Sequence, residues 1–114
     1  MLKKGWRLKT NEEFQRVFRQ GKPLFFGAIA CKIIRNDLGH LRLGFSFAKK
    51  HLEKAVMRNR ARRVISEAFS CSLAEGKQFP PIDIVFFSVK KPLVKEKLPF
   101  ASIAKSVVEY VNEQ

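Results

Sequence analysis

The sequence predicts a single α/β domain of the α+β type, a two-layer sandwich in which three helices cover a mixed sheet of about four strands. Three segments repeat apolar residues at intervals of three or four, and the segments around them are rich in β-branched and aromatic residues. The chain has 114 residues, of which 46% are hydrophobic, enough to bury one core. The predicted order is helix, strands, helix, strand, helix, in one domain over residues 1–114.

The first helix is predicted between Thr10 and Gly21. Thr10 can cap the helix, and Glu13, three residues further on, completes a capping box, while Gly21 is a natural stop. Phe14 and Phe18 then lie on one apolar stripe. A phenylalanine pair at this spacing is more often part of a core than of a binding platform, and both interpretations stay open at this point.

The strands follow from three segments. PLFFGAIACKIIR (23–35) is interpreted as one strand or a broken pair, and HLRLGFSFAKK (40–50) alternates strictly. In the second segment Leu41, Leu43, Phe45 and Phe47 share one face, and Arg42, Gly44, Ser46 and Ala48 share the other. The alternation predicts a sheet covered on one side, with a small and basic face left accessible. IDIVFFSVKK (82–91) is almost continuously apolar, which predicts a central strand.

Two further helices are predicted, from Glu53 to Ser72 and within LPFASIAKSVVEYVNEQ (98–114). The last segment has a helical stripe of six apolar residues: Phe100, Ile103, Ala104, Val107, Val108 and Val111. This stripe is typical of an amphipathic helix that closes a domain.

The charge balance is strongly basic, with 23 Lys+Arg against 10 Asp+Glu and a formal net charge of +13. Such an excess favours nucleic acid or an anionic membrane as a partner. No stretch is long and apolar enough for a transmembrane helix, and no secretion signal is found, so we expect a cytoplasmic protein with no membrane partner. Cys31 and Cys71 lack metal-ligand spacing; each is expected to be reduced and largely buried.

The segment AVMRNRARRVISEAF (55–69) concentrates arginine on one face of a predicted helix. A helical projection places Met57, Ala61, Val64, Ile65 and Ala68 on one side and Asn59, Arg60, Arg62, Arg63, Ser66 and Glu67 on the other, with Arg58 at the boundary. A solvated basic face is the plain alternative. However, few acidic residues interrupt the charge, and guanidinium groups suit bidentate phosphate contacts. Since no helix-turn-helix or dimeric zipper is present, we favour RNA over DNA.

The sequence offers no set of residues for RNA cleavage. His40 and His51 have no carboxylate partner at a readable spacing and are expected to be ordinary surface residues. The serines and cysteines lack a nucleophile-elbow context, the carboxylates are scattered, and no glycine-rich loop is present to cradle a phosphate. We therefore predict no catalytic residue and no metal site in the protein.

Three motifs in order resemble the bacterial ribonuclease P protein component. KAVMRNRARRVISEAF is similar to the arginine-rich helix of that family, RLKTNEEFQRVFRQGK to its first helix, and LRLGFSFAKK to the strand and loop before the arginine motif. The resemblance covers nearly the whole chain. In two places the sequence departs from the family: residues 51–54 (HLEK) stand where many members have a shorter turn with glycine, and Ala61 is smaller than usual.

The resemblance implies a protein subunit of ribonuclease P, in which a catalytic RNA with bound Mg²⁺ removes the 5′ leader of precursor tRNA. One protein per RNA is expected, as is a left-handed crossover around the arginine helix, against the usual rule. When the roles known for the family are carried over to the matching positions of this sequence, the residues that would contact the catalytic RNA are Lys49, Lys50, Lys54, Arg58, Asn59, Arg60, Arg62 and Arg63. The residues that would line the cleft for the leader are Phe14, Phe18, Lys32, Arg42 and Ser46.

The alternative function is a basic RNA-binding or ribosomal-type protein with no role in tRNA processing. It would explain the charge and the fold class. It would not explain three family motifs in the right order.

Overall fold

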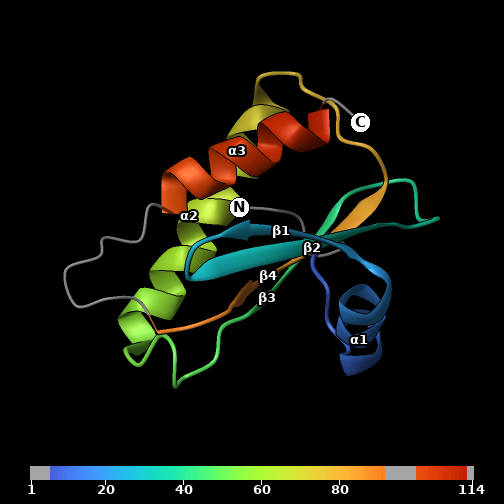
Figure 1. Cartoon of the computed structure of the whole chain (residues 1–114). Helices are drawn as coiled ribbons and strands as arrows, with labels where there is room; N and C mark the ends of the chain where they lie inside the picture. Colours follow the sequence, from blue (N-terminus) through green and yellow to red (C-terminus); the bar gives the residue numbers. More distant parts are fainter. Residues whose placement is uncertain (1–5, 92–99, 113–114) are drawn as a thin grey trace.

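The computed structural model describes residues 6–91 and 100–112, and within them the predicted order of elements is confirmed (Figure 1). The elements are α1 (Asn11–Gln20), β1 (Lys22–Phe26), β2 (Ile29–Arg35), β3 (Arg42–Ser46), α2 (Ala55–Ala74), β4 (Ile82–Ser88) and α3 (Phe100–Asn112). None of the helices in these residues is both long and apolar enough to cross a membrane.

The four strands form one mixed sheet in the order β1-β2-β4-β3. β1, β2 and β4 are antiparallel, whereas β3 and β4 are parallel, with α2 in the connection between them. The apolar run of β4 is central, as predicted, because it is flanked on both sides and almost fully buried. The segment 23–35 is the broken pair: Gly27, with φ of 76°, adopts the left-handed conformation that a two-residue hairpin turn needs.

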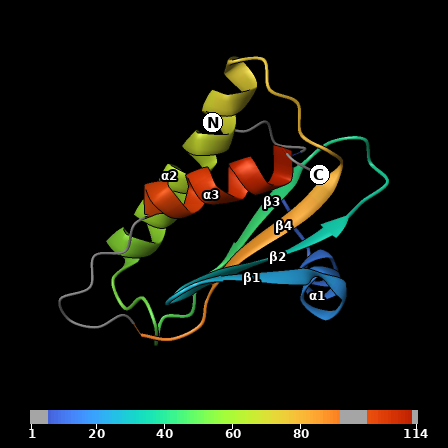
Figure 2. The same ribbon diagram turned by 45° about the horizontal axis from the view of Figure 1, so that its top comes forward.

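The main core lies between one face of the sheet and the helices α2 and α3, which cross on that face (Figures 1 and 2). All six apolar residues predicted for the last helix are buried. On α2 the buried stripe runs through Ala61, Ile65 and Phe69. The apolar side predicted for this helix is therefore confirmed against the sheet, whereas Arg62 and Ser66, predicted for the opposite side, are half-buried.

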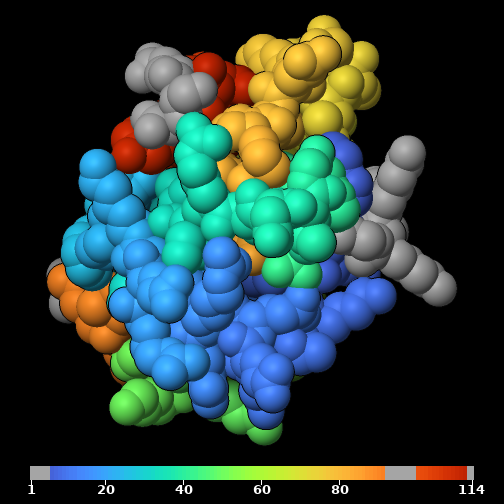
Figure 3. Space-filling view, turned by 90° about the vertical axis from the view of Figure 1, so that its right-hand side faces the viewer, coloured from blue at the N-terminus to red at the C-terminus, as the bar shows by residue number. Residues whose placement is uncertain are grey.

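Helix α1 packs on the opposite face of the sheet, so the prediction of a sheet covered on one side only is wrong for that region. The apolar stripe of α1 needs a surface to bury against, and Val17 finds it on Val85 and Leu8. Gly44 makes this approach possible: a Cβ there would lie 2.8 Å from both Leu8 and Phe14. In the space-filling view α1 (blue) and the segment between β2 and β3 (cyan to green) form one continuous surface (Figure 3).

The ends of α1 match the prediction closely. Thr10 accepts a hydrogen bond from the Glu13 N–H, and the Glu13 carboxylate accepts one from the Thr10 N–H, which together make the predicted capping box. The N–H of Gly21 donates to Val17 O at 2.7 Å and closes the helix. A Cβ at Gly21 would lie only 2.5 Å from that same carbonyl oxygen, so the glycine is needed for close approach.

The two cysteines differ from each other. Cys31 is buried, and burial raises the pKa of its thiol to about 12. Cys71 is exposed, so the prediction that it is largely buried is wrong: it lies between Phe69 and Ser72, which occupy the inward side of α2. Both cysteines are free thiols.

Candidate RNA-binding site

The arginines of α2 share one helix but point in different directions. Arg58 turns back along the chain, where its guanidinium donates to Leu52 O at 2.7 Å and to Glu53 O at 2.9 Å. α2 begins at Ala55, two residues after the predicted start, and its N-cap residue Lys54 makes no side-chain capping bond. Arg58 therefore fixes the turn that leads into the helix.

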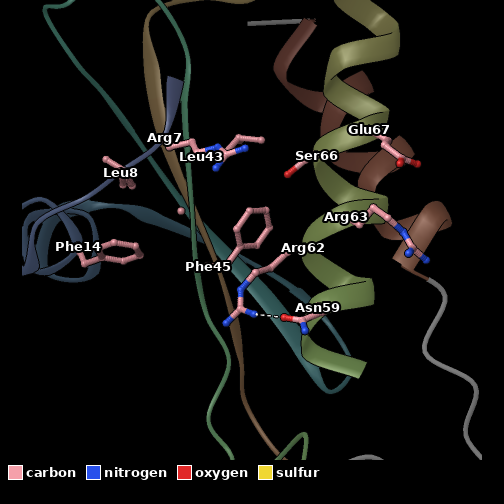
Figure 4. A pocket seen from close by; sticks show the side chains of 11 residues that line it. Arg7, Leu8, Phe14, Leu43, Phe45, Asn59, Arg62, Arg63, Ser66 and Glu67 are labelled. Carbon is pink, nitrogen blue, oxygen red and sulfur yellow. Dashed lines mark hydrogen bonds between the residues drawn. The ribbon is translucent and has the colours of Figure 1, made fainter. Parts of the chain in front are cut away.

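Arg62 and its neighbour Asn59 form a pair on the side of α2 that faces β3. Arg62 Nη1 donates to Asn59 Oδ1 at 2.9 Å, and the half-buried Arg62 side chain extends toward the sheet (Figure 4). This contact holds the guanidinium in a fixed direction.

Arg60 and Arg63 are exposed, and within the described part of the chain neither has a hydrogen bond or an ion pair. Lys54, Lys49 and Lys50 are also exposed, in and before the turn that enters the helix. We call these five residues the basic surface. The nearby Glu53 does not neutralise it, because its carboxylate pairs with Lys91 at 2.7 Å and that hydrogen bond lowers the pKa of Glu53.

A second surface lies on the far face of the sheet, next to α1. The ring of Phe18 meets that of Phe87 edge-on with centroids 5.4 Å apart, and Lys32 Nζ lies 5.9 Å from the Phe18 centroid. Lys32 also donates to Phe18 O at 2.5 Å. Phe25 on the edge strand β1 is 66% exposed. We call Phe18, Phe25 and Phe87 the aromatic face.

Phe25 and Phe87 were not among the residues predicted for the site. The sheet register aligns them: Phe25 pairs with Ala30, Ala30 with Phe87, and Phe87 with Ser46 in a single row across four strands. Ser46, a predicted leader residue, is exposed at the end of that row. The alternation within a strand predicts the face of the sheet to which each side chain points. Which residues of different strands lie side by side follows only from the order and register of the strands, which the sequence did not reveal.

Phe14 lies apart from the aromatic face, toward the β3 edge of the sheet. It is half-buried against the small core around Leu8 and Val17. Phe18 belongs to the edge of the same cluster. The two phenylalanines of the predicted pair are therefore both partly core, but only Phe18 joins an exposed aromatic group.

Arg42 has its guanidinium engaged within the protein. Its Nε and Nη2 donate to the two carboxylate oxygens of Asp83 at 2.9 and 2.8 Å, and its Nη1 bonds to Glu13. Asp83 is fully buried and also accepts from Asn36 at 2.7 Å and from Arg16 at 3.3 Å. Because Glu13 and Arg16 belong to α1, this cluster joins that helix to the sheet.

The charge cluster shifts the titration of Glu13. Partial burial by itself would raise the pKa, but hydrogen bonds from the Thr10 and Lys9 N–H groups and the charge of Arg42 outweigh it and lower the pKa to about 2. A carboxyl whose pKa is lowered on folding stabilises the fold above its unfolded pKa of 4.5, and that contribution disappears as the pH falls toward 2.

The two histidines are half-buried, and the prediction of ordinary surface residues does not describe their packing. His51 Nδ1 lies 2.9 Å from Ser88 Oγ, and the ring of His40 stacks on Trp6 with centroids 5.5 Å apart. His51 thereby joins the loop after β3 to the end of β4, and His40 joins the loop after β2 to the segment before α1. Among residues 6–91 and 100–112, no three His, Cys, Asp or Glu side chains come together in a way that could hold a metal ion.

Comparison with known proteins places this geometry in a family. The family model for ribonuclease P matches residues 2–113. The ribonuclease P protein component of Clostridioides difficile is 34% identical over 105 residues, covering 92% of this chain and 88% of the relative. That of Coxiella burnetii is 36% identical over 81 residues, covering 71% of this chain and 64% of the relative.

A solved structure of the Staphylococcus aureus RNase P protein superposes with a TM-score of 0.70 at 27% identity, covering 95% of this chain and 93% of the other. The fold, the sequence match and the arginine helix therefore agree. The chain belongs to the ribonuclease P protein component family, whose members are part of a ribonucleoprotein endoribonuclease.

Proposed function

We propose that this protein binds the ribonuclease P RNA through the basic surface and holds the 5′ leader of precursor tRNA on the aromatic face. The RNA, with its Mg²⁺, then hydrolyses the phosphodiester that joins leader and tRNA. One protein acts with each RNA, in the cytoplasm. The observation that carries this proposal is the separation of the two surfaces: α2 covers one face of the sheet, and the aromatic face lies on the other.

The basic surface supports binding to folded RNA. Arg60 and Arg63 have no internal partner among the described residues, so their guanidinium groups can bond to phosphate without first breaking an ion pair. Since α2 is packed on the sheet through Ala61, Ile65 and Phe69, both side chains extend from backbone positions that the fold holds in place. The basic surface is therefore suited to contacts with the phosphate backbone of the RNA.

The aromatic face supports binding to a single strand. Bases of unpaired RNA stack on exposed aromatic rings, while nearby cations neutralise the phosphates. Phe18 and Phe87 supply rings of this kind, and Lys32 supplies the charge. The row that continues from Phe25 to Ser46 crosses the sheet and gives a strand of RNA a path.

A protein-bound Mg²⁺ does not fit the residues described. The one fully buried carboxylate, Asp83, is occupied by two arginines and an asparagine, and Glu13 is occupied by Arg42 and two backbone N–H groups. Mg²⁺ binds through oxygen ligands and usually keeps several of its own water molecules, so it needs carboxylates that are free and accessible. We therefore place the ion on the RNA and derive no step for the protein through it.

Reconstitution tests the proposal. Added to the ribonuclease P RNA at low Mg²⁺, the protein should raise the rate of cleavage of precursor tRNA, and alone it should leave that substrate intact. The readout is the yield of mature 5′ ends on a gel. Cleavage by nuclease-free protein without RNA, or no effect on the RNA, would contradict the proposal.

Phe18→Ala should weaken binding of leader-bearing precursor to the reconstituted enzyme by about 1–3 kcal/mol, because a stacking platform is lost. Binding of mature tRNA, which has no leader, should stay the same. Phe25→Ala serves as a second variant, since Phe25 is 66% exposed and its loss costs the core little. Equal losses for precursor and mature tRNA would instead mean that these rings support the fold alone.

A further inference from the structure

A pocket of about 580 Å³ opens at the free edge of β3, between that strand, the segment before α1, and α2 (Figure 4). Its volume falls in the range of small-ligand sites. It is distinct from the aromatic face, because none of Phe18, Phe25 and Phe87 lines it, although Phe14 of α1 does so at the β3 edge.

The pocket exists because the edge of β3 is only partly covered. Leu8 N–H donates to Leu43 O at 2.9 Å, and Arg7 and Leu43 form a single parallel bridge, after which the chain turns into α1. β3 is the last strand of the sheet, so no further strand among the described residues pairs with its outer edge beyond that bridge.

The floor of the pocket is apolar and aromatic. Leu43 is buried, and the half-buried Phe45 stacks on Phe86 with centroids 5.8 Å apart and an interplanar angle of 20°. Phe86 holds the Phe45 ring from within the core, while the ring itself projects toward α2 (Figure 4). A flat hydrophobic group could rest against a ring that is already fixed in place.

The walls carry positive charge. Arg62 extends from α2 toward β3, held by Asn59, and Arg7 reaches in from the opposite side (Figure 4). Neither guanidinium has a carboxylate partner among the described residues. Ser66 also points into the pocket, whereas the only acidic lining residue, Glu67, points away from it (Figure 4).

A flat apolar floor between two unneutralised guanidinium groups suits a ligand that is planar and anionic. We propose that this pocket takes one unstacked nucleotide of the ribonuclease P RNA, with its base against Phe45 and its phosphates on Arg7 and Arg62. The proposal rests on the function proposed above and names a specific contact within it. The pocket is continuous with the arginine helix, which argues for this RNA over the leader.

The first test uses the protein alone. Adenosine 5′-monophosphate and inorganic phosphate are titrated separately while backbone amide signals are followed by NMR. The nucleotide should shift the signals of Leu43, Phe45 and Ser66 and bind about 10-fold more tightly than phosphate, because the base adds stacking to the charge. Equal affinities for the two probes would overturn the proposal.

The second test blocks the pocket. Ser66→Phe places a ring in the cavity without changing any charge, and Ser106→Phe makes the same change at an exposed position of α3. Ser66→Phe should lower affinity for the ribonuclease P RNA about 10-fold, with an unchanged slope of log affinity against log salt, and Ser106→Phe should have no effect. Phe45→Leu is the second variant, to be used if Ser66→Phe disturbs the fold. It keeps the floor of the pocket apolar but removes the ring on which the base would stack, and it should lower the affinity by a similar factor.

These outcomes separate the two proposals. If the wild-type protein stimulates cleavage but Ser66→Phe and Phe45→Leu both bind the RNA like wild type, the pocket proposal fails and the function stands. A loss confined to precursor tRNA, with none on the ribonuclease P RNA alone, would also overturn the pocket assignment. If the wild-type protein does not stimulate cleavage, the proposed function fails, while the titration with the mononucleotide still reports on the pocket.

Discussion

Replacing Asp83 with alanine is expected to lower the free energy of unfolding by about 3–5 kcal/mol. Asp83 is fully buried, and Arg42, whose side chain is only 13% exposed, donates two hydrogen bonds to it. The substitution would leave Nε and Nη2 of the largely buried Arg42 guanidinium without acceptors, with Glu13 as its one remaining carboxylate partner among the described residues. It would also remove an acceptor from Asn36 and from Arg16 of α1.

Urea denaturation followed by circular dichroism measures this effect. Asp37→Ala removes an acid of the same type from an exposed turn and should change the free energy of unfolding by less than about 0.5 kcal/mol. Asp83→Leu combined with Arg42→Met should recover most of the loss, because removing both charges leaves no buried ion unpaired. A loss below about 1 kcal/mol for Asp83→Ala would show that the cluster does not stabilise the fold.

Local sequence signals predicted the elements that depend on neighbours in the chain. The capping box of Thr10 and Glu13 is formed within four residues, so its spacing alone determines it. The stripe of α3 is also local, and all its predicted residues are buried. The central position of β4 followed from its continuous apolar run, since only a strand covered on both faces needs one.

The role of Arg42 could not be predicted in this way. Alternation correctly places it on the opposite face from Leu43, and that face was expected to be accessible. Its partner Asp83 is 41 positions away, and the pairing exists only because β3 lies parallel beside β4. A helical projection could not predict the directions of the Arg58 and Arg62 side chains either, because it does not show what lies beside the helix in the fold. Arg58 bonds to the preceding turn, and Arg62 faces an edge strand.

Arg60→Ala with Arg63→Ala is expected to weaken binding to the ribonuclease P RNA by on the order of 100-fold, at about 1.4 kcal/mol for each lost charge-assisted contact. Each arginine that neutralises a phosphate adds about 0.7–0.9 to the magnitude of the slope of log affinity against log salt. The double variant should therefore reduce that slope by about 1.5. The measurement is filter binding across a series of salt concentrations.

Lys77→Ala with Lys105→Ala removes the same charge from exposed positions on other elements and serves as the control. If that pair costs as much affinity as the α2 pair, net charge and not the basic surface governs binding. Arg60→Lys with Arg63→Lys should keep the salt slope but lose part of the affinity, because an ammonium cannot make the bidentate contact of a guanidinium.

Arg58→Ala provides the opposite contrast, because Arg58 donates to two backbone carbonyls of its own chain. Its loss should lower thermal stability, whereas the Arg60 and Arg63 substitutions should not, since those side chains have no partner among the described residues. The same motif would then contain two kinds of arginine, one that builds the entry to α2 and one that α2 presents to RNA. The assignment would be wrong if Arg58→Ala kept its thermal stability and reduced the slope of log affinity against log salt as much as the Arg60 and Arg63 substitutions do. Arg58 would then be a residue that contacts RNA and not one that builds the entry to α2.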